Sequence, residues 1–343
     1  MRALIPLVLI VALAGCSEVP AAPDPRAAES DALFADFDTD EPGCTAAVGL
    51  DGGVAWAGAA GLADLDSGEE LTPDSVVDFA SISKQFTATA VLMLERQGVL
   101  SQDDTLDTWV HDLPDWASRV TLANLIHHTS GIPDYVYILD AGDDEVTTNA
   151  DVNAVLADQE LGGDPGTYFE YSNSNYVLLA EVVESATGMP LPQWLDENIF
   201  TPLGLELVDD PAYDGPALAV SYDEDGHDEK FTPELSSWAQ YGDGGIHGTP
   251  SALVAWLDEY RTGSLGVLDA QLVDPDGWGY AAGIELSGDG ALEHTGSWLA
   301  FLSKFSVSAD RHAEVVVTCN RDDGDPDALV DQLKAIWFAP SGG

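Results

Sequence analysis

The sequence predicts a mixed α/β fold of the α+β kind, in which an antiparallel sheet is flanked by terminal helices and interrupted by a mostly helical insertion. Strand-like runs occur at 45–50 and return from 278 to 319. The segment between them is mostly helical in pattern and is punctuated by Gly and Pro. We therefore place the sheet part at about 44–80 and 255–340 and the helical part at about 81–254.

The N-terminus predicts an export signal. Met1 to Ala14 has one positive charge, at Arg2, and then an apolar run of about ten residues, too short to span a bilayer. The end of this run, Leu13-Ala14-Gly15-Cys16, resembles a bacterial lipoprotein box, so we expect residues 1–15 to be a signal peptide and Cys16 to be lipidated. Ordinary cleavage after small residues is the alternative. The prediction is an exported protein anchored by a lipid in the cell envelope, at the outer membrane or periplasm if the cell is Gram-negative.

Residues 16–43 are rich in Pro, Ala and Asp, and they predict an acidic tether. The folded domain should run from 44 to 340. It should open with a hairpin at 46–61, whose turn is Asp51-Gly52-Gly53, and it should close with an amphipathic helix at 325–338.

The charge of the chain is strongly negative, with 61 acidic residues against 11 basic ones. This balance argues against nucleic acid as a partner. Because the acids are spread along the chain, we expect a surface adapted to salt, as in a halophilic or marine exported enzyme; a lineage biased toward acidic exported proteins is the alternative. The sequence has no H-E-x-x-H motif or metal-binding Cys/His spacing, and we expect no cofactor and no metal.

A Ser-x-x-Lys motif places Ser81 and Lys84 one helical turn apart. Residues 86–94 are apolar almost all round, which predicts a buried helix. A cation in its first turn loses water and meets the positive end of the helix dipole, and both effects favour the neutral amine that a general base requires. We expect Ser81 to be a nucleophile and Lys84 its base; the alternative is that Ser81 only caps the helix.

Two further motifs follow in order. Tyr171-Ser172-Asn173 precedes an apolar helix at 176–183, and His294-Thr295-Gly296 lies between strand-like runs at 278–286 and 298–307. Ser-x-x-Lys alone should occur by chance in roughly one chain in four, whereas the three motifs in this order should co-occur in well under about one per cent.

With these motifs the chain resembles the serine β-lactamase-related hydrolases, which include class C β-lactamases, DD-carboxypeptidases and related esterases. Residues 78–88, 125–134, 242–250 and the final strand and helix also resemble the family, so the similarity covers about residues 44–338. It implies a β-lactamase/DD-peptidase-like fold with the site between sheet and helices. His294 stands where class C enzymes usually have a lysine. A histidine at this position resembles some DD-peptidases and esterases instead.

The resemblance also implies roles for these residues. Ser81 would be the nucleophile, Lys84 and Tyr171 would move protons, and the backbone N–H groups of Ser81 and Ser297 would form the oxyanion hole. The substrate would be bound by Asn173, His294, Thr295, Gly296 and Ser297.

Cys44 opens the first strand and Cys319 closes the last one. In the family these strands are neighbours in one antiparallel sheet, so the resemblance implies that a disulfide is geometrically reasonable; an exported compartment would permit it. Two free buried thiols are the alternative.

We therefore predict an exported, lipid-anchored serine hydrolase without a cofactor, acting through an acyl-enzyme on D-amino-acid peptides or esters. Peptidoglycan fragments and β-lactams belong to the expected partners. The competing class is a non-catalytic β-lactam- or peptidoglycan-sensing penicillin-binding module that is acylated and never turns over. We expect His294 to carry a charge below about pH 6.5 and to hold a substrate carboxylate. His127 and His128 are expected to serve only as a helix end, while Trp298 and Tyr241 either line the substrate cleft or simply pack.

Overall fold

The computed structural model describes residues 24–140, 146–224, 230–235 and 237–338. The predicted signal peptide and the lipidation at Cys16 lie outside the described residues. Within these ranges, no helix is both long and apolar enough to cross a membrane.

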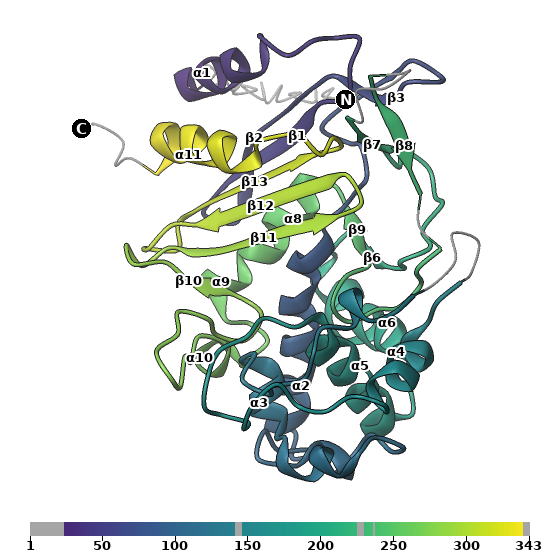
Figure 1. Cartoon of the computed structure of the whole chain (residues 1–343). Helices are drawn as coiled ribbons and strands as arrows, with labels where there is room; N and C mark the ends of the chain where they lie inside the picture. Colours follow the sequence, from purple (N-terminus) through teal and green to yellow (C-terminus); the bar gives the residue numbers. More distant parts are fainter. Residues whose placement is uncertain (1–23, 141–145, 225–229, 236, 339–343) are drawn as a thin grey trace, which may run out of the picture.

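A six-stranded antiparallel sheet forms the centre of the molecule (Figure 1). From one edge to the other its strands are β10 (Glu285–Leu286), β11 (Leu292–Trp298), β12 (Phe301–Val307), β13 (Ala313–Cys319), β1 (Cys44–Leu50) and β2 (Gly53–Ala60). Pairing of β1 with β13 brings the N-terminal hairpin beside the C-terminal strands. β1 is buried almost throughout because both faces of the sheet are covered, with Ala46 and Val48 in one apolar core and Ala47 in the other.

Two terminal helices, α1 (Pro25–Phe34) and α11 (Pro326–Trp337), cover one face of the sheet (Figure 1). Asp24 caps α1 through the Arg26 N–H, and Pro25 occupies the first turn, where it is favoured. The ring of Phe34 lies 5.6 Å from that of Trp56, and Trp337 Nε1 donates to Ser30 Oγ. The predicted tether is therefore wrong for residues 24–43, because this segment gains enough apolar burial on the sheet to fold.

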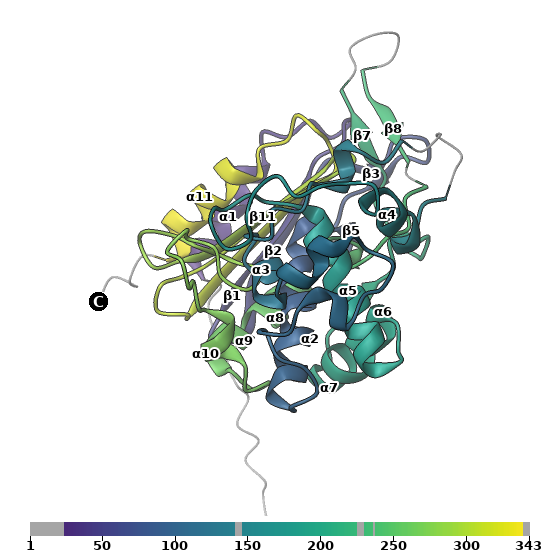
Figure 2. The ribbon, with the colours of Figure 1, turned by 60° about the horizontal axis from the view of Figure 1, so that its bottom comes forward.

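The helical body lies on the opposite face (Figures 1 and 2). Its longer helices are α2 (Lys84–Arg96), α4 (Asn149–Leu156), α5 (Asn173–Thr187) and α8 (Pro250–Leu257). The short ones are α3 (Leu122–Ile126), α6 (Leu191–Leu195), α7 (Thr201–Leu203), α9 (Glu259–Thr262) and α10 (Leu268–Gln271). α2 is buried from Lys84 to Leu94 and packs against α5, while α8 packs on β1 and β13.

Small strands and single turns complete the chain. The strands are β3 (Leu62–Asp64) with β4 (Glu69–Glu70), β7 (Ser221–Asp223) with β8 (Thr232–Glu234), and β5 (Val77–Asp78), β9 (Ile246–Gly248) and β6 (Leu207–Asp209) in a third sheet. The turns are 3₁₀ segments η1 (Ala80–Ser83), η2 (Leu106–Thr108), η3 (Asp115–Arg119) and η4 (Tyr135–Tyr137), and a π segment η5 (Asp196–Phe200).

The strand-like run at 278–286 is a strand only at Glu285–Leu286, so the prediction is wrong for most of it. Gly277, Gly279 and Gly283 all have φ near +75°, which bends the chain away from extended geometry. At Gly283 a Cβ would lie 2.6 Å from the backbone of Gln85, so the bend also lets this loop approach α2 closely.

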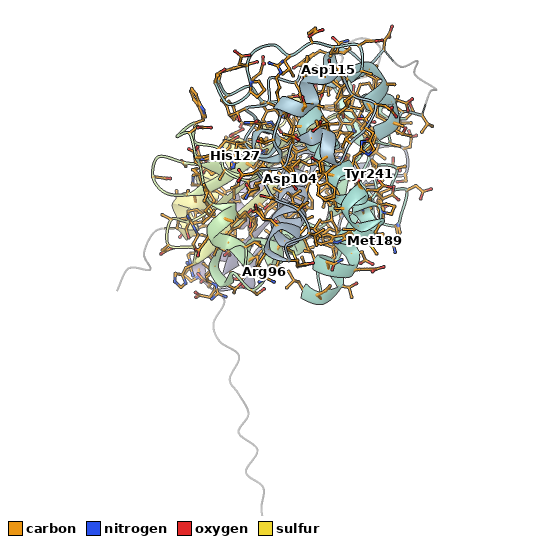
Figure 3. All side chains as sticks on the ribbon, turned by 90° about the horizontal axis from the view of Figure 1, so that it is seen from below. Arg96, Asp104, Asp115, His127, Met189 and Tyr241 are labelled. Carbon is orange, nitrogen blue, oxygen red and sulfur yellow. A yellow bond between two sulfur atoms is a disulfide. The ribbon has the colours of Figure 1, made fainter. Side chains whose placement is uncertain are left out.

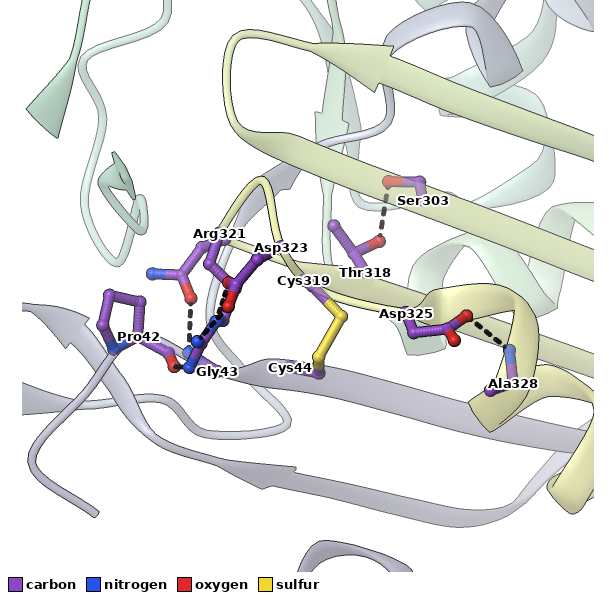
Figure 4. The surroundings of a disulfide bond; sticks show 11 residues. Pro42, Gly43, Cys44, Ser303, Thr318, Cys319, Arg321, Asp323, Asp325 and Ala328 are labelled. Carbon is purple, nitrogen blue, oxygen red and sulfur yellow. Dashed lines mark hydrogen bonds and ion pairs between the residues drawn. A yellow bond between two sulfur atoms is a disulfide. The ribbon is translucent and has the colours of Figure 1, made fainter. Parts of the chain in front are cut away.

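Cys44 and Cys319 lie directly opposite each other in the register of β1 and β13, and they form a disulfide (Figure 4). The sequence analysis left open whether these two cysteines form a disulfide or stay as free thiols, and the structure contains the disulfide. It fastens the first strand, β1, to the last strand, β13, beside the Asn320 side chain that accepts the Gly43 N–H.

Candidate active site

Ser81 and Lys84 meet at the junction of η1 and α2. Lys84 Nζ lies 3.0 Å from Ser81 Oγ, and the lysine side chain is completely buried. Its other two contacts are with Asn173 Oδ1 and the main-chain oxygen of Asp243, both at 2.7 Å. Three oxygens from three separate segments therefore fix the amine. The residue before the nucleophile, Ala80, has a φ of 49°, an unusual conformation for a residue with a side chain.

Asn173 is oriented by a second contact. It is the first residue of α5, and its Nδ2 donates to Asp134 Oδ2 at 2.9 Å. Since the amide nitrogen is committed to a carboxylate, the amide oxygen must face Lys84. The burial of Asp134 raises the pKa of its carboxyl, against the opposing effect of the hydrogen bonds and of Lys84.

Tyr171 lies beside Lys84 without a direct hydrogen bond to it. Lys84 Nζ is 5.1 Å from the centroid of the Tyr171 ring, and 36% of the tyrosine is exposed. Its hydroxyl makes no hydrogen bond within the described ranges. The Tyr171 ring also packs against His128, with the centroids 4.3 Å apart.

The sequence analysis expected His128 only to end a helix, but in the structure it also makes contacts within the site. It is completely buried, and its Nδ1 contacts both the Ser172 N–H and Asn175 Nδ2. Burial holds the pKa of His128 well below its ordinary value, so the ring is neutral. This neutral ring, tied to the residue that follows Tyr171, supports the tyrosine from behind. The segment 125–134, which contains His128 and resembled the family, was the feature of the sequence that could have indicated this role.

His294 does not match the expected role. It lies inside β11 rather than between strands, only 1% of it is exposed, and its ring nitrogens contact the Thr295 carbonyl and the Tyr280 hydroxyl. Burial lowers the pKa of His294 to about 4. The expectation that an imidazolium at this position holds a substrate carboxylate near neutral pH is therefore wrong, because the ring is desolvated and uncharged there.

The edge of β11 faces η1. A Cβ at Gly296 would collide with the Phe79 carbonyl oxygen, so only glycine allows this close approach. The two-residue hairpin pairs Trp298 with Phe301, and since ladder pairs alternate, the Ser297 N–H points away from β12. No strand pairs with this part of β11 within the described chain. The Ser297 N–H is therefore directed to the free edge, on the side of Ser81, while Thr295 is exposed.

A cavity of about 110 Å³ opens at Ser81. Of the predicted residues, Ser81, Asn173 and Ser297 line it; Lys84 lies beneath Ser81, and Tyr171, His294, Thr295 and Gly296 are not part of its wall. The sequence analysis left open whether Trp298 lines the cleft, and it does. Tyr241 lines two other surface depressions instead, on the side of the helical body opposite His127 in the view from below (Figure 3).

Several residues that line the cavity were not predicted. They are Asp78, Tyr135, Trp238, Gln240 and Asp243. Burial raises the pKa of the Asp78 and Asp243 carboxyls. Both carboxyls come from segments that resembled the family, 78–88 and 242–250, but no motif in these segments assigned a role to either residue.

A Ser-x-x-Lys pair with a serine nucleophile is part of the signature of class A β-lactamases and penicillin-binding proteins. The sequence matches the Beta-lactamase family over residues 30–336. The chain therefore belongs to the Beta-lactamase family, and both the resemblance and the fold class predicted from the sequence are confirmed.

Among curated relatives, the chain is similar to penicillin-binding protein 4* of Bacillus subtilis, with 34% identity over 149 residues, or 42% of this chain and 33% of that protein. It is also similar to a D-aminopeptidase of Brucella anthropi, with 30% identity over 275 residues, or 76% of this chain and 49% of the relative. The chain thus spans half or less of the length of these two relatives.

Two solved structures share the fold. A penicillin-binding protein homologue from Pyrococcus abyssi has a TM-score of 0.75 at 23% identity, covering 91% of this chain and 75% of its own. A D-amino acid amidase from Ochrobactrum anthropi SV3 has a TM-score of 0.74 at 22% identity, covering 86% and 93%.

Proposed function

We propose that this protein is a serine hydrolase that transfers the acyl group of D-amino-acid amides, peptides or esters to Ser81 and then to water. The observation that carries the proposal is the set of contacts made by Lys84. A neutral lysine has two N–H bonds and one lone pair. The Asn173 and Asp243 oxygens can only accept, so in the neutral form they take both N–H groups, and the lone pair is left for the Ser81 hydroxyl, whose Oγ lies 3.0 Å away.

This arrangement supports proton removal as the nucleophile reacts. Ser81 Oγ forms a bond to the substrate carbonyl carbon, its proton moves to Lys84 Nζ, and the carbonyl π pair moves to oxygen. The N–H groups of Ser81 and Ser297 stabilise the resulting oxyanion. When the tetrahedral species collapses, the bond to the leaving amine or alcohol breaks, and the leaving group takes the proton from Lys84, with the Tyr171 hydroxyl as its relay.

Water completes the cycle. It attacks the acyl ester on Ser81 while giving a proton to Lys84, the Oγ–carbonyl bond breaks, and the proton returns to Ser81 Oγ as the carboxylic acid leaves. The choice of D-amino-acyl substrates is supported by the relatives, which include a D-aminopeptidase. This chain also shares its fold with a D-amino acid amidase. A penicillin-binding relative supports β-lactams as a further class of acylating ligand.

We also propose that the protein is exported and held in the cell envelope by a lipid on Cys16. The disulfide between Cys44 and Cys319 supports export, because such bonds persist in oxidising compartments and are rare in the cytosol. Labelling of cells with a radioactive fatty acid, compared between the natural chain and Cys16→Ala, tests the anchor; equal labelling of both would contradict it.

The hydrolase proposal is tested on the purified protein with D-alanine p-nitroanilide, p-nitrophenyl acetate and a fluorescent penicillin. Ser81→Ala should abolish turnover and the covalent mass increment. Lys84→Ala should cost nearly as much, since residues that act as a unit are not additive. Ser118→Ala, a change at an exposed serine outside the cavity, should keep full activity. Covalent labelling that survives in Ser81→Ala would remove the proposal, and a stoichiometric burst without turnover would support the sensor class instead.

A further inference from the structure

We propose that the cavity beside Ser81 binds a protonated amine, so that the preferred acyl donors are D-amino-acyl groups with a free α-ammonium rather than N-acylated or carboxylate-bearing ones. The inference rests on the proposed hydrolase function and specifies its substrate class. It is argued from the charge, the aromatic surface and the size of the cavity.

Two carboxyl groups are part of the polar wall of the cavity. Asp78 and Asp243 both line the cavity, and each is more than nine-tenths buried. Asp243 Oδ2 accepts from the Tyr135 hydroxyl at 2.9 Å, and Asp78 Oδ1 accepts the Ala80 N–H at 2.7 Å. Both of these donors are neutral, and they fix the two carboxyl groups in position. His247 is the basic side chain nearest Asp78, with Nε2 3.7 Å from Oδ2.

A third carboxylate lies behind the wall. Asp209 is 92% buried, and its Oδ1 has no hydrogen-bond partner among the described residues. Gly245 lines the cavity, and a Cβ at that position would lie 3.0 Å from this oxygen. Burial and mutual repulsion with Asp210, Asp243 and Asp78 raise the pKa of Asp209 well above its ordinary value. A cation bound nearby would offset this repulsion, so the group of carboxyls should bind a positively charged ligand in preference to a neutral or negative one.

Three aromatic side chains also line the cavity. The rings of Trp238 and Trp298 have centroids 5.5 Å apart, and Tyr135 lies 6.0 Å from Trp238. All three residues line the cavity. Aromatic faces attract organic cations, and the attraction grows where water is excluded. Carboxylates and aromatic rings together are a combination suited to an ammonium group.

No positive group is placed to receive a carboxylate. The residues that line the cavity in the described part of the chain include no Lys, Arg or His. Lys84 is committed to three oxygens beneath Ser81, and His294 is buried and neutral. An α-amine is attached to the carbon next to the reacting carbonyl. When that carbonyl is at Ser81, the amine must therefore enter the same small cavity.

The experiment compares two substrates that differ only at the amine, D-alanine p-nitroanilide and N-acetyl-D-alanine p-nitroanilide, at pH 6.5. We expect kcat/KM to be roughly tenfold to 100-fold higher for the free amine, the range of one charge-assisted hydrogen bond. Asp243→Asn should reduce this ratio by about tenfold or more, and Trp298→Leu should reduce it less. Asp331→Asn removes the same charge from an exposed position on α11, and it should leave the ratio unchanged.

The outcomes separate the two proposals. If neither anilide, neither corresponding methyl ester nor p-nitrophenyl acetate is turned over, the hydrolase function itself fails. If the acetylated compounds are hydrolysed as fast as the free amines by the unaltered protein, the hydrolase stands and amine recognition is overturned. A ratio that falls equally in Asp331→Asn would also overturn it, because the effect would then come from net charge. Should Asp243→Asn fail to fold, the ratio in the unaltered protein and in Trp298→Leu decides.

Discussion

Exchange of Asn173 for Asp tests the chemistry of Lys84 most directly, because it changes one atom type at a fixed distance. Asn173 Oδ1 lies 2.7 Å from Lys84 Nζ. A carboxylate at this distance would favour the ammonium form of the lysine by about 6 kcal/mol at an effective dielectric constant of 20, and solvent would reduce this figure. The ammonium has no lone pair for the Ser81 proton. We therefore expect kcat/KM at neutral pH to fall by at least about 100-fold, the lower end of what general base catalysis contributes.

The same exchange also disturbs Asp134, which loses the Asn173 Nδ2 donor and meets a second carboxylate. The double variant Asn173→Asp/Asp134→Asn is the matched control, because an asparagine at 134 restores a donor while the negative charge stays beside Lys84. It should recover thermal stability but not activity at neutral pH, and both variants should regain rate as the pH is raised. If Asn173→Asp keeps the rate and pH profile of the unaltered protein, Lys84 is not the base in the geometry described here.

Two further predictions concern stability. The chain has a formal net charge of −50, and these negative charges repel one another in the folded state. Because the screening length falls from roughly 30 Å at 0.01 M NaCl to about 3 Å at 1 M, the Tm should rise over this range of salt. A flat or falling Tm would contradict a salt-adapted surface. Glu314 is buried, neither of its carboxyl oxygens has a hydrogen-bond partner among the described residues, and burial raises its pKa from 4.5 to about 7. Because the folded protein holds this proton more tightly than the unfolded chain, stability should be lost between pH 4.5 and 7, by roughly 3 kcal/mol in urea denaturation, and Glu314→Gln should abolish that loss.

The sequence located Ser81 and Lys84 because their relation is local: three residues on one helix suffice to bring them together. It misjudged His294, because the charge of a histidine depends on burial, and the burial came from Tyr280 and the loop around it. The sequence analysis also missed Asp243 and Trp238, because their place in the cavity depends on tertiary structure. These residues acquire a shared function only when separate loops meet at the cavity, and no periodicity records that meeting.

Helix α1 shows the opposite error. Its sequence contains a local signal for a helix start, but the tether prediction followed the composition of the segment instead. Asp24 followed by Pro25 is a favourable helix start, yet the Pro, Ala and Asp content of the surrounding segment predicted a tether. The decisive contribution is tertiary, since Phe34 is buried against Trp56 and Trp337 contacts Ser30. A short amphipathic helix of this kind is stable only with the sheet beneath it, which a reading of the isolated segment does not include.

The proposed oxyanion hole depends on strand register as much as on sequence. Its two N–H groups come from Ser81 and Ser297, and only the second is positioned by the sheet. A slip of one residue in β11 would turn the Ser297 N–H toward β12 and bring the side chain of Ser297 or Thr295 to the place where only Gly296 fits against Phe79. The register is set by the tight turn after Trp298 and by continuous pairing across β12 and β13 to β1. The position of the Ser297 N–H in β11 therefore depends on strand pairing that extends across the sheet to β1.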